Sequence, residues 1–268
     1  MEHHVTEEIS HANSGVDVAL QEQQDLNTKF HPEIAAGGYA QDDGTVEFYQ
    51  RVVSVIPEGA VVLDLGAGRG SAFYAKLGPW KHWLLRLGKK YSRRIGADVD
   101  PAVKHNPELD QAEIIEPGKP LPFADQTFDL ILCDWVLEHI EDPVSFAAEV
   151  RRVLKVGGWF CARTPNRWSY YAVGVRLMNE AMEAKALRFL QPNRKEIDTF
   201  PKIYRLNTLR DIRQHFSPNY WADACHTSNP NPAYHGNQPW LFHLLKVFCA
   251  LTPSSLAPVI LIFVRRVA

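Results

Sequence analysis

The stretch Val61-Val62-Leu63-Asp64-Leu65-Gly66-Ala67-Gly68-Arg69-Gly70 decides the fold class of this chain. Its apolar first half begins with β-branched residues, which predicts a buried parallel strand over 61–65. The glycines that follow permit a tight turn and leave bare backbone at the start of the next helix, where a ligand can lie. By itself, such a loop is shared by dinucleotide-binding sites and by purely structural turns.

Further strand and helix patterns alternate along the chain. Strands are predicted at 94–99, 112–115, 128–133, 159–163, 220–225 and 259–264. Helices are predicted at 46–53, with Asp43 or Thr45 as N-cap, at 143–154, from Asn207 or Thr208 to 216, and at 240–250. Gly157-Gly158 is expected to close the helix over 143–154. This alternation predicts a mostly parallel sheet with helices on both faces and ligands at the carboxyl ends of its strands.

Length and composition are those of an ordinary globular protein. The 268 residues suit one large α/β domain. We expect a flexible N-terminal tail over 1–28 and one domain over 29–268, with an insertion at 77–93 and a lid or acceptor region at 165–258. The 29 basic residues nearly balance 31 acidic ones, so no global field favours nucleic acid or an anionic membrane, and we expect no nucleic-acid partner.

Cysteine usage and the apolar runs predict a cytoplasmic protein. The four cysteines contain no CxxC pair and read as reduced, buried thiols, and no set of side chains has convincing metal-ligand spacing. The first residues lack the pattern of a secretory signal, and no apolar run approaches the ~20 residues that span a bilayer.

Asp64 distinguishes this loop from a dinucleotide site. The glycine spacing is G-x-G-x-G, and the carboxylate comes two residues before the first glycine. There it would repel a pyrophosphate but suit a ligand with an ammonium group. The other explanation is that Asp64 only caps the turn.

A second acidic residue is expected at the end of the next strand. In Ile95-Gly96-Ala97-Asp98-Val99-Asp100-Pro101, Asp98 is placed to accept the hydroxyl groups of a ribose. Asp100, which precedes Pro101, is the better N-cap for the following helix. The distance from the loop to Asp98 exceeds the ~20 residues of a dinucleotide site, and the excess falls in the insertion.

Four stretches together resemble one family. LDLGAGRG (63–70), GADVDP (96–101), LPFADQTFDLILCDWVLEHIEDP (121–143) and EVRRVLKVGGWFCARTPN (149–166) are similar, in register, to the class I S-adenosylmethionine (SAM)-dependent methyltransferases. Within that class the chain resembles the ubiquinone/menaquinone-biosynthesis-like, methyltransferase type 11, group. The resemblance covers 61–166 and implies a seven-stranded Rossmann-like sheet whose last strand, here 259–264, is antiparallel.

The resemblance also implies a cofactor site. Asp64 and the glycines would hold the methionine part of SAM, and Asp98 the ribose. For the adenine site, the family usually has an acidic residue a few positions before the stretch LPF. The corresponding residue here is Glu116, which is offset by about one position and is followed by Pro117 and Gly118. The positions expected to bind SAM are Asp64, Gly66, Ala67, Gly68, Gly70, Asp98, Val99, Glu116, Leu121, Cys133 and Trp135.

The segment after the fourth strand is expected to line the methyl-transfer pocket. His139 and Asp134 are the candidate catalytic groups for removing a proton from an acceptor. For each the alternative is a packing role, His139 as a capping or core histidine and Asp134 against cofactor or substrate. Aromatic and polar side chains of the lid suit a sugar or phenolic acceptor, and about half of them are expected only to pack; the candidates are Asn166, Trp168, Tyr171, Tyr204 and Arg205.

The acceptor is the least determined feature. DTFPKIYRLNT (198–208) resembles a continuation in members linked to polysaccharide or glycolipid synthesis, which favours O-methylation of a small or lipid-linked acceptor such as a glycan precursor. Methylation of a quinone or phenol ring and a non-catalytic SAM-binding scaffold remain alternatives. The basic, tryptophan-containing stretch Trp80–Arg94 could rest on an anionic membrane, but a helix flank packed on the domain is the commoner explanation.

Overall fold

The computed structural model describes residues 28–70, 77–176, 202–232 and 235–268. The expected N-terminal tail therefore lies almost wholly outside the described residues, as does the part of the predicted lid between 177 and 201.

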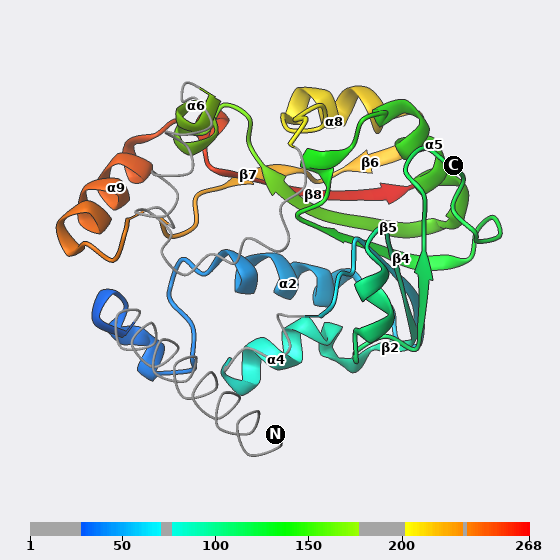
Figure 1. Ribbon diagram of the computed structural model, residues 1–268, viewed down its shortest axis with the longest axis horizontal. Coiled ribbons are helices and arrows are strands. Elements are labelled where there is room, and N and C mark those ends of the chain that lie inside the picture. The colour runs from blue at the N-terminus through cyan, green and yellow to red at the C-terminus, as the bar shows by residue number, and fades with distance from the viewer. Residues whose placement is uncertain (1–27, 71–76, 177–201, 233–234) are drawn as a thin grey trace, which may run out of the picture.

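The core is an eight-stranded sheet in the order β3-β2-β1-β4-β5-β8-β6, with the short β7 also paired to β8 (Figure 1). Strands β1 to β5 run parallel to one another, and β8 is antiparallel to β5. The predicted α/β fold with a reversed last strand is confirmed. The count differs from seven because 226–228 adds a strand beside β8. The strands are β1 (Ala60–Leu65), β2 (Tyr91–Asp98), β3 (Gln111–Ile114), β4 (Phe128–Asp134), β5 (Leu154–Pro165), β6 (Trp221–Asp223), β7 (His226–Ser228) and β8 (Val259–Arg266).

The helices begin where side chains can satisfy their first N–H groups. Asp43 Oδ1 accepts from the N–H groups of Thr45 and Val46, and Thr208 Oγ1 accepts from Asp211, so Asp43 and Thr208 are the N-caps among the predicted alternatives. The α-helices are α2 (Gly44–Val55), α4 (Pro79–Leu85), α5 (Pro143–Val153), α6 (Tyr170–Arg176), α8 (Leu209–His215) and α9 (Pro239–Leu251). Short 3₁₀ helices are η1 (Pro32–Ala35), η2 (Leu87–Lys89), η3 (Pro101–His105), η4 (Leu137–His139) and η6 (Ser254–Leu256).

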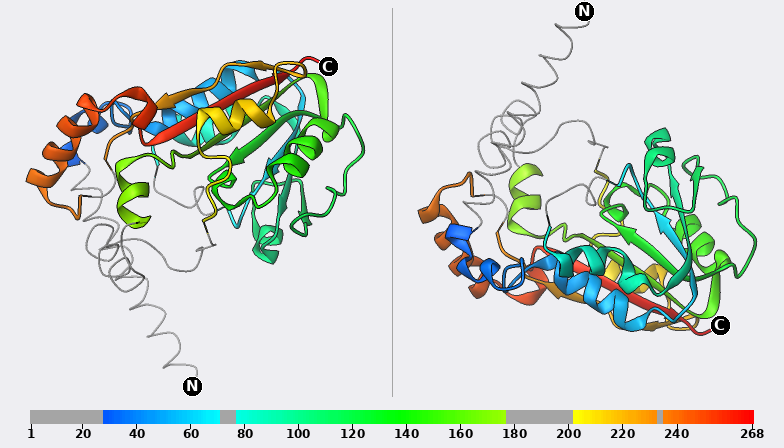
Figure 2. Two further views of the ribbon diagram at one scale, coloured as in Figure 1. Left: turned by 90° about the horizontal axis from the view of Figure 1, so that it is seen from above. Right: turned by 90° about the horizontal axis from the view of Figure 1, so that it is seen from below.

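Helices cover both faces of the sheet, and each face buries its own apolar cluster (Figure 2). On one face α5 and α8 pack on the strands, and Phe216 stacks on Phe160 at 5.1 Å. On the other face α2 and α4 cover the sheet, with Phe48 and Leu84 fully buried. Burial on both faces explains why the central strands read as continuous apolar runs.

The region 154–158 differs from the prediction. Gly157 and Gly158 do not close α5 but lie within β5, which starts directly after α5 at Leu154. A Cβ at Gly158 would come within 2.9 Å of the carbonyl oxygen of Asp129 in β4. The glycine is therefore required by the close approach of two strands rather than by the end of a helix.

The insertion 77–93 forms α4, η2 and the first residues of β2. Its leucines Leu84, Leu85 and Leu87 are buried. Two of its basic groups are paired within the domain, Lys81 with Asp43 at 2.7 Å and Arg86 with Glu108 at 2.6 Å. These contacts describe a segment packed on the domain. None of the helices in the described part of the chain has the length and apolarity needed to cross a bilayer.

Replacing Phe160 by alanine is expected to lower the free energy of unfolding by about 3–5 kcal/mol. Phe160 is fully buried in β5, and its loss would leave a cavity beside Phe216. Urea unfolding followed by circular dichroism measures the change. Val156→Ala, on an exposed position of the same strand, is the control and should stay within about 0.5 kcal/mol of the wild type. Equal losses in the two variants would contradict this account of the core.

Candidate functional site

The glycine loop is the most constrained backbone at the carboxyl edge of the sheet. Gly66, Gly68 and Gly70 all have positive φ, at +80°, +52° and +73°. A Cβ on Gly66 would lie 2.1 Å from Val136 Cγ2, and one on Gly70 would lie 2.5 Å from the side chain of Asn106. At Gly68 a Cβ would meet no described atom within 4 Å. The loop is thus pressed against the protein at its two ends and open at Gly68.

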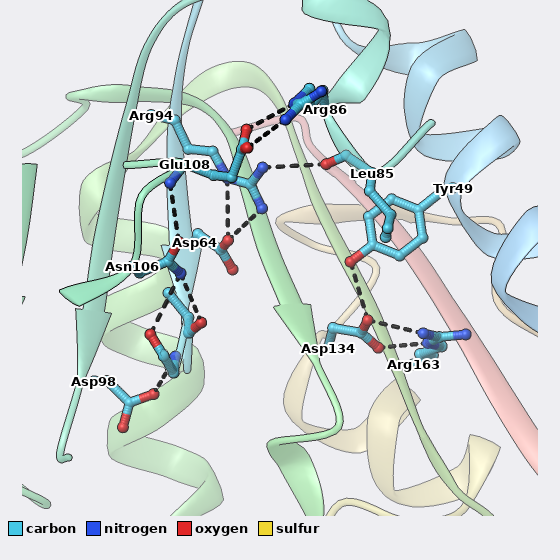
Figure 3. A network of polar contacts seen from close by, with 12 residues as sticks. Tyr49, Asp64, Leu85, Arg86, Arg94, Asp98, Asn106, Glu108, Asp134 and Arg163 are labelled. Atoms are coloured by element: carbon cyan, nitrogen blue, oxygen red, sulfur yellow. Dashed lines mark hydrogen bonds and ion pairs between the residues drawn. The ribbon is translucent and has the colours of Figure 1, made fainter. Parts of the chain in front are cut away.

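Asp98, the last residue of β2, joins its strand to this loop. Its Oδ2 accepts from the Gly68 N–H at 2.8 Å, and its Oδ1 accepts from the Asp100 N–H at 2.8 Å. Asn106 holds the other side of the loop by donating to the carbonyl of Ala67 at 3.0 Å (Figure 3). A carboxylate has about four acceptor positions, so Asp98 keeps capacity for further donors. Asp100 caps η3 by accepting from Ala102, as expected, although the helix is of the 3₁₀ type.

Two exposed apolar side chains flank Asp98. Val99 follows it directly, and Ile114 ends β3 opposite it in register. Val99 was predicted from the sequence, whereas Ile114 was missed, because only the pairing of β2 with β3 places it there. Glu116 is exposed on the loop that follows β3. The N–H of Leu121 donates to Glu149 and its carbonyl accepts from Arg152, so its backbone is bonded within the domain, and its contact with SAM stays a prediction.

Asp64 is not a free carboxylate. Arg94, in β2, donates to Asp64 Oδ2 from Nε at 3.1 Å and from Nη2 at 2.5 Å, and it also bonds to the carbonyl of Leu85 (Figure 3). Burial raises the pKa of Asp64, and the charge of Arg94 opposes that rise. Because the pair is neutral as a whole, Asp64 attracts an ammonium group less than the sequence suggested. The sequence signal for this ion pair was Arg94 itself, because an arginine inside a buried strand requires an acidic partner.

Asp134 is likewise bound inside the protein. It ends β4 and pairs in register with Arg163 of β5. Both of its oxygens accept from Arg163, Oδ2 at 2.9 Å, and Tyr49 Oη donates to the same Oδ2 at 3.0 Å. Three donors therefore bind this one carboxylate. The geometry favours a packing role for Asp134, which was one of the two alternatives from the sequence, and it does not support proton removal by Asp134.

Trp135, the residue after β4, has an unusual backbone conformation. Its φ of +59° is rare for a residue with a side chain, and its ring is partly exposed, 5.2 Å from the Arg163 guanidinium. A strained backbone held by its neighbours is typical of a functional site. Val136, the next residue, contacts Gly66, so this turn borders the glycine loop. Cys133, in contrast, is fully buried, and its place in the cofactor site stays a prediction.

Glu138 is a buried carboxylate that the sequence did not single out. It accepts from Thr164 Oγ1 at 3.1 Å, and Thr164 in turn accepts from Asn207 Nδ2 at 2.8 Å. The Glu138 carbonyl accepts from the N–H groups of Ile203 and Tyr204. Burial raises the pKa of Glu138. This network ties η4, which contains the half-buried His139, to the 203–207 segment across the ends of β4 and β5.

The predicted acceptor residues separate into two groups. Asn166 is buried and donates to the carbonyls of Ser255 and Ala257, and Tyr171 Oη donates to the carbonyl of Pro258. Their polar atoms hold the chain together, so the prediction that they bind substrate is not supported. Trp168 is exposed, Tyr204 has a positive φ of +58°, and Arg205 bonds the carbonyl of Glu141. Among the described residues no cluster of side chains could hold a metal ion.

Comparison with known proteins finds a likeness to methyltransferases in the middle part of the chain. Residues 63–162 match the family model described as a methyltransferase domain. Over these residues the chain is similar to the methyltransferase domain. A curated relative, an uncharacterized methyltransferase of Mycobacterium sp. (strain JLS), is 32% identical over 127 residues, 46% of each chain. An uncharacterized protein of Methanocaldococcus jannaschii is 34% identical over 38% of this chain and 43% of its own. The chain thus matches less than half the length of these relatives.

Solved structures share the fold. The complex of the Trm112 methyltransferase activator with a methyltransferase from Haloferax volcanii aligns with a TM-score of 0.51 at 20% identity, covering 83% of this chain and 90% of that one. A SAM-dependent methyltransferase from Listeria monocytogenes aligns with a TM-score of 0.50 at 13% identity, covering 83% and 97%. The described residues fit the SAM of this methyltransferase class: the space over Gly68 is open, and the Asp98 carboxylate borders it.

Replacing Arg94 by methionine is expected to lower the free energy of unfolding by about 3–5 kcal/mol, because Asp64 would remain buried and charged without a partner. Since burial raises the pKa of Asp64, the loss should shrink as the pH falls through that pKa and the carboxyl group becomes neutral. Chemical unfolding at several pH values measures both effects.

The matched control is Asp64→Asn combined with Arg94→Met, which removes both charges. It should recover most of the stability that Arg94→Met loses and should lack the acid-side recovery. A double variant as unstable as the single one would contradict the ion-pair account.

Proposed function

We propose that this chain transfers the methyl group of SAM to an oxygen atom of a small or lipid-linked acceptor, such as a glycan precursor. The observation that carries the cofactor half of the proposal is the Asp98 carboxylate, bonded to the Gly68 N–H at 2.8 Å beside the open part of the glycine loop. A negative group at this place suits a ribose diol and disfavours a pyrophosphate.

The chain's own residues act chiefly by positioning. When bound, SAM supplies a methyl group that its sulfonium has already activated for transfer. Asp98 orients the ribose, and the bare backbone at Gly68 lets the ligand approach closely. Trp135, fixed over Arg163, closes the side of the site next to the loop. His139 is the group proposed to accept a proton from the acceptor hydroxyl, because both oxygens of the alternative, Asp134, already accept hydrogen bonds from Arg163 and Tyr49.

The acceptor is proposed to lie beside η4 and the 203–207 segment that is bonded to it. The Glu138–Thr164–Asn207 network fastens this segment across the strand ends, where His139 is half-buried. Tyr204 and Arg205 are on the fastened segment, and Trp168 offers an exposed aromatic face, a surface that suits a sugar ring. The likeness of 198–208 to glycolipid and polysaccharide enzymes supports the same class; of that stretch the structure describes 202–208.

An aromatic-ring acceptor is the second candidate. It is favoured by the exposed ring of Trp135, which is stacked over the Arg163 guanidinium at 5.2 Å. A flat phenol or quinone would find an aromatic surface there. The third candidate, a scaffold that binds SAM without turnover, shares the cofactor site and differs only in the product.

Asp98→Asn is expected to weaken SAM binding by about tenfold or more, because a charged acceptor for the ribose hydroxyls becomes a neutral amide. Isothermal calorimetry with SAM and with its demethylated product S-adenosylhomocysteine measures the loss. The control is Asp223→Asn, which neutralises a carboxylate on β6 that is paired with Arg213, and it should bind like the wild type. Tight binding of NAD with no affinity for either SAM compound would overturn the cofactor assignment.

Incubation of the chain with methyl-labelled SAM and cell extract should place label in the lipid or glycan fraction. His139→Ala should lower the rate of label transfer by about 10²–10⁴-fold while leaving SAM binding unchanged, if the imidazole accepts the proton. Label in a small aromatic product would favour the ring acceptor, and label in no fraction would favour the scaffold. Near-normal transfer by His139→Ala would remove the base assignment alone.

A further inference from the structure

Helix α9 is apolar on both of its sides. Its inner side packs through Phe242 and Cys249, and the ring of Phe30 stacks on Phe242 at 4.7 Å. Its outer side carries exposed side chains at positions i, i+4, i+7, i+8 and i+11, which fall within about 100° of arc at the helical repeat. These residues are Trp240, Leu244, Val247, Phe248 and Leu251. An amphipathic helix would have polar residues here, so this outer side needs an explanation.

The apolar surface continues from α9 onto its neighbours. The rings of Tyr170 in α6 and Phe248 in α9 lie 5.8 Å apart. Figure 1 shows α6 and α9 together at one end of the molecule, away from the far edge of the sheet. Trp168, just before α6, is 52% exposed. We call the five exposed residues of α9 together with Trp168 the docking face.

The charges nearest to Trp168 in the docking face are positive. The guanidinium groups of Arg167 and Arg176 lie 5.3 and 5.5 Å from the ring of Trp168. The sequence has no aspartate or glutamate between 163 and 179 and none after Asp223. Lys246 of α9 is paired with Asp42 at 3.7 Å. The arginines flanking Trp168 therefore give this end a positive character that the near-neutral chain as a whole lacks.

We propose that the docking face binds the surface of an anionic lipid bilayer. Exposed tryptophans, aliphatic side chains and arginines without acidic neighbours in the sequence form the combination that enters the interface between headgroups and acyl chains. With 13 residues, α9 is shorter than the ~20 needed to span a bilayer, so it lies along the surface. A second copy of the chain is a poorer occupant, because a symmetric contact would bring the arginines of both copies together with few acids to pair them.

The docking face lies at the same edge of the sheet as the cofactor loop. Pro165, the carboxyl end of β5, pairs with Val259, and Asn166 bonds to the carbonyls of Ser255 and Ala257 in the turn after α9. The glycine loop follows the carboxyl end of the parallel strand β1. Docking would hold this edge close to the lipid headgroups, where a lipid-linked acceptor resides. The binding itself does not depend on methyl transfer.

Sedimentation of the full chain with vesicles tests the proposal. Vesicles of phosphatidylcholine with about one-third phosphatidylglycerol should bind the chain, whereas vesicles of phosphatidylcholine alone should bind it more weakly, and added salt should reduce the binding. The double variant Leu244→Glu with Val247→Glu should bind the anionic vesicles at least about tenfold more weakly, because two apolar contacts become repelled charges.

The matched control is Val156→Glu with Val267→Glu. These valines are 53% and 50% exposed, against 58% for both Leu244 and Val247, and they lie at the opposite edge of the sheet. The control adds the same charge and should bind like the wild type. SAM calorimetry on all three proteins reports folding and tests the cofactor site separately.

Two results would overturn the proposal that the docking face binds anionic lipid. One is failure of the wild type to bind anionic vesicles while it still binds SAM. The other is equal loss of vesicle binding in the double variant and its control, which would reduce the effect to net charge. A wild-type dimer that Leu244→Glu with Val247→Glu converts to a monomer, without vesicle binding, would assign this face to a second copy instead.

Discussion

The ion pair of Asp64 with Arg94 lies directly below the glycine loop, and the neighbouring elements are arranged around it. It connects β1 to β2, and through the carbonyl of Leu85 it connects both strands to α4. Two charges buried in this way are tolerated only when they are paired and bonded further. The inserted α4 segment completes the pair by capping the arginine. The insertion thus has a structural task at the base of the cofactor site.

Acidic residues lie at or next to the carboxyl ends of three neighbouring strands, β2, β1 and β4, yet their partners give them different chemistry. Asp64 is neutralised by Arg94, and Asp134 is held by Arg163 and Tyr49. Within the described part of the chain, Asp98 accepts hydrogen bonds from the backbone N–H groups of Gly68 and Asp100 and has no basic side chain as a partner. Its charge is therefore the one that we propose acts on a ligand. The sequence predicted that two carboxylates, Asp64 and Asp98, would repel a diphosphate. Because Asp64 is paired with Arg94, Asp98 is the carboxylate left to do so.

The region proposed to bind the acceptor is held together by hydrogen bonds rather than by ion pairs. Between η4 and the 203–207 segment, the contacts are buried hydrogen bonds among Glu138, Thr164 and Asn207 rather than ion pairs. Buried polar networks of this kind fix one arrangement, because each unsatisfied group would be costly. The acceptor edge continues through Asn166 into the turn after α9 and so into the docking face. Cofactor loop, acceptor segment and docking face share one edge of the sheet.

The sequence by itself determined the parallel sheet, the reversed last strand and the cofactor loop, because these follow from local patterns: apolar runs, glycine spacing and capping residues. It also located Asp98, since a strand end can be read from the residues around it. It could not determine the partners of Asp64 and Asp134, the place of Ile114 beside Asp98, the glycines inside β5 or the role of Glu138. Each of these depends on contacts between residues distant in the chain, and only strand pairing in three dimensions decides which side chains meet.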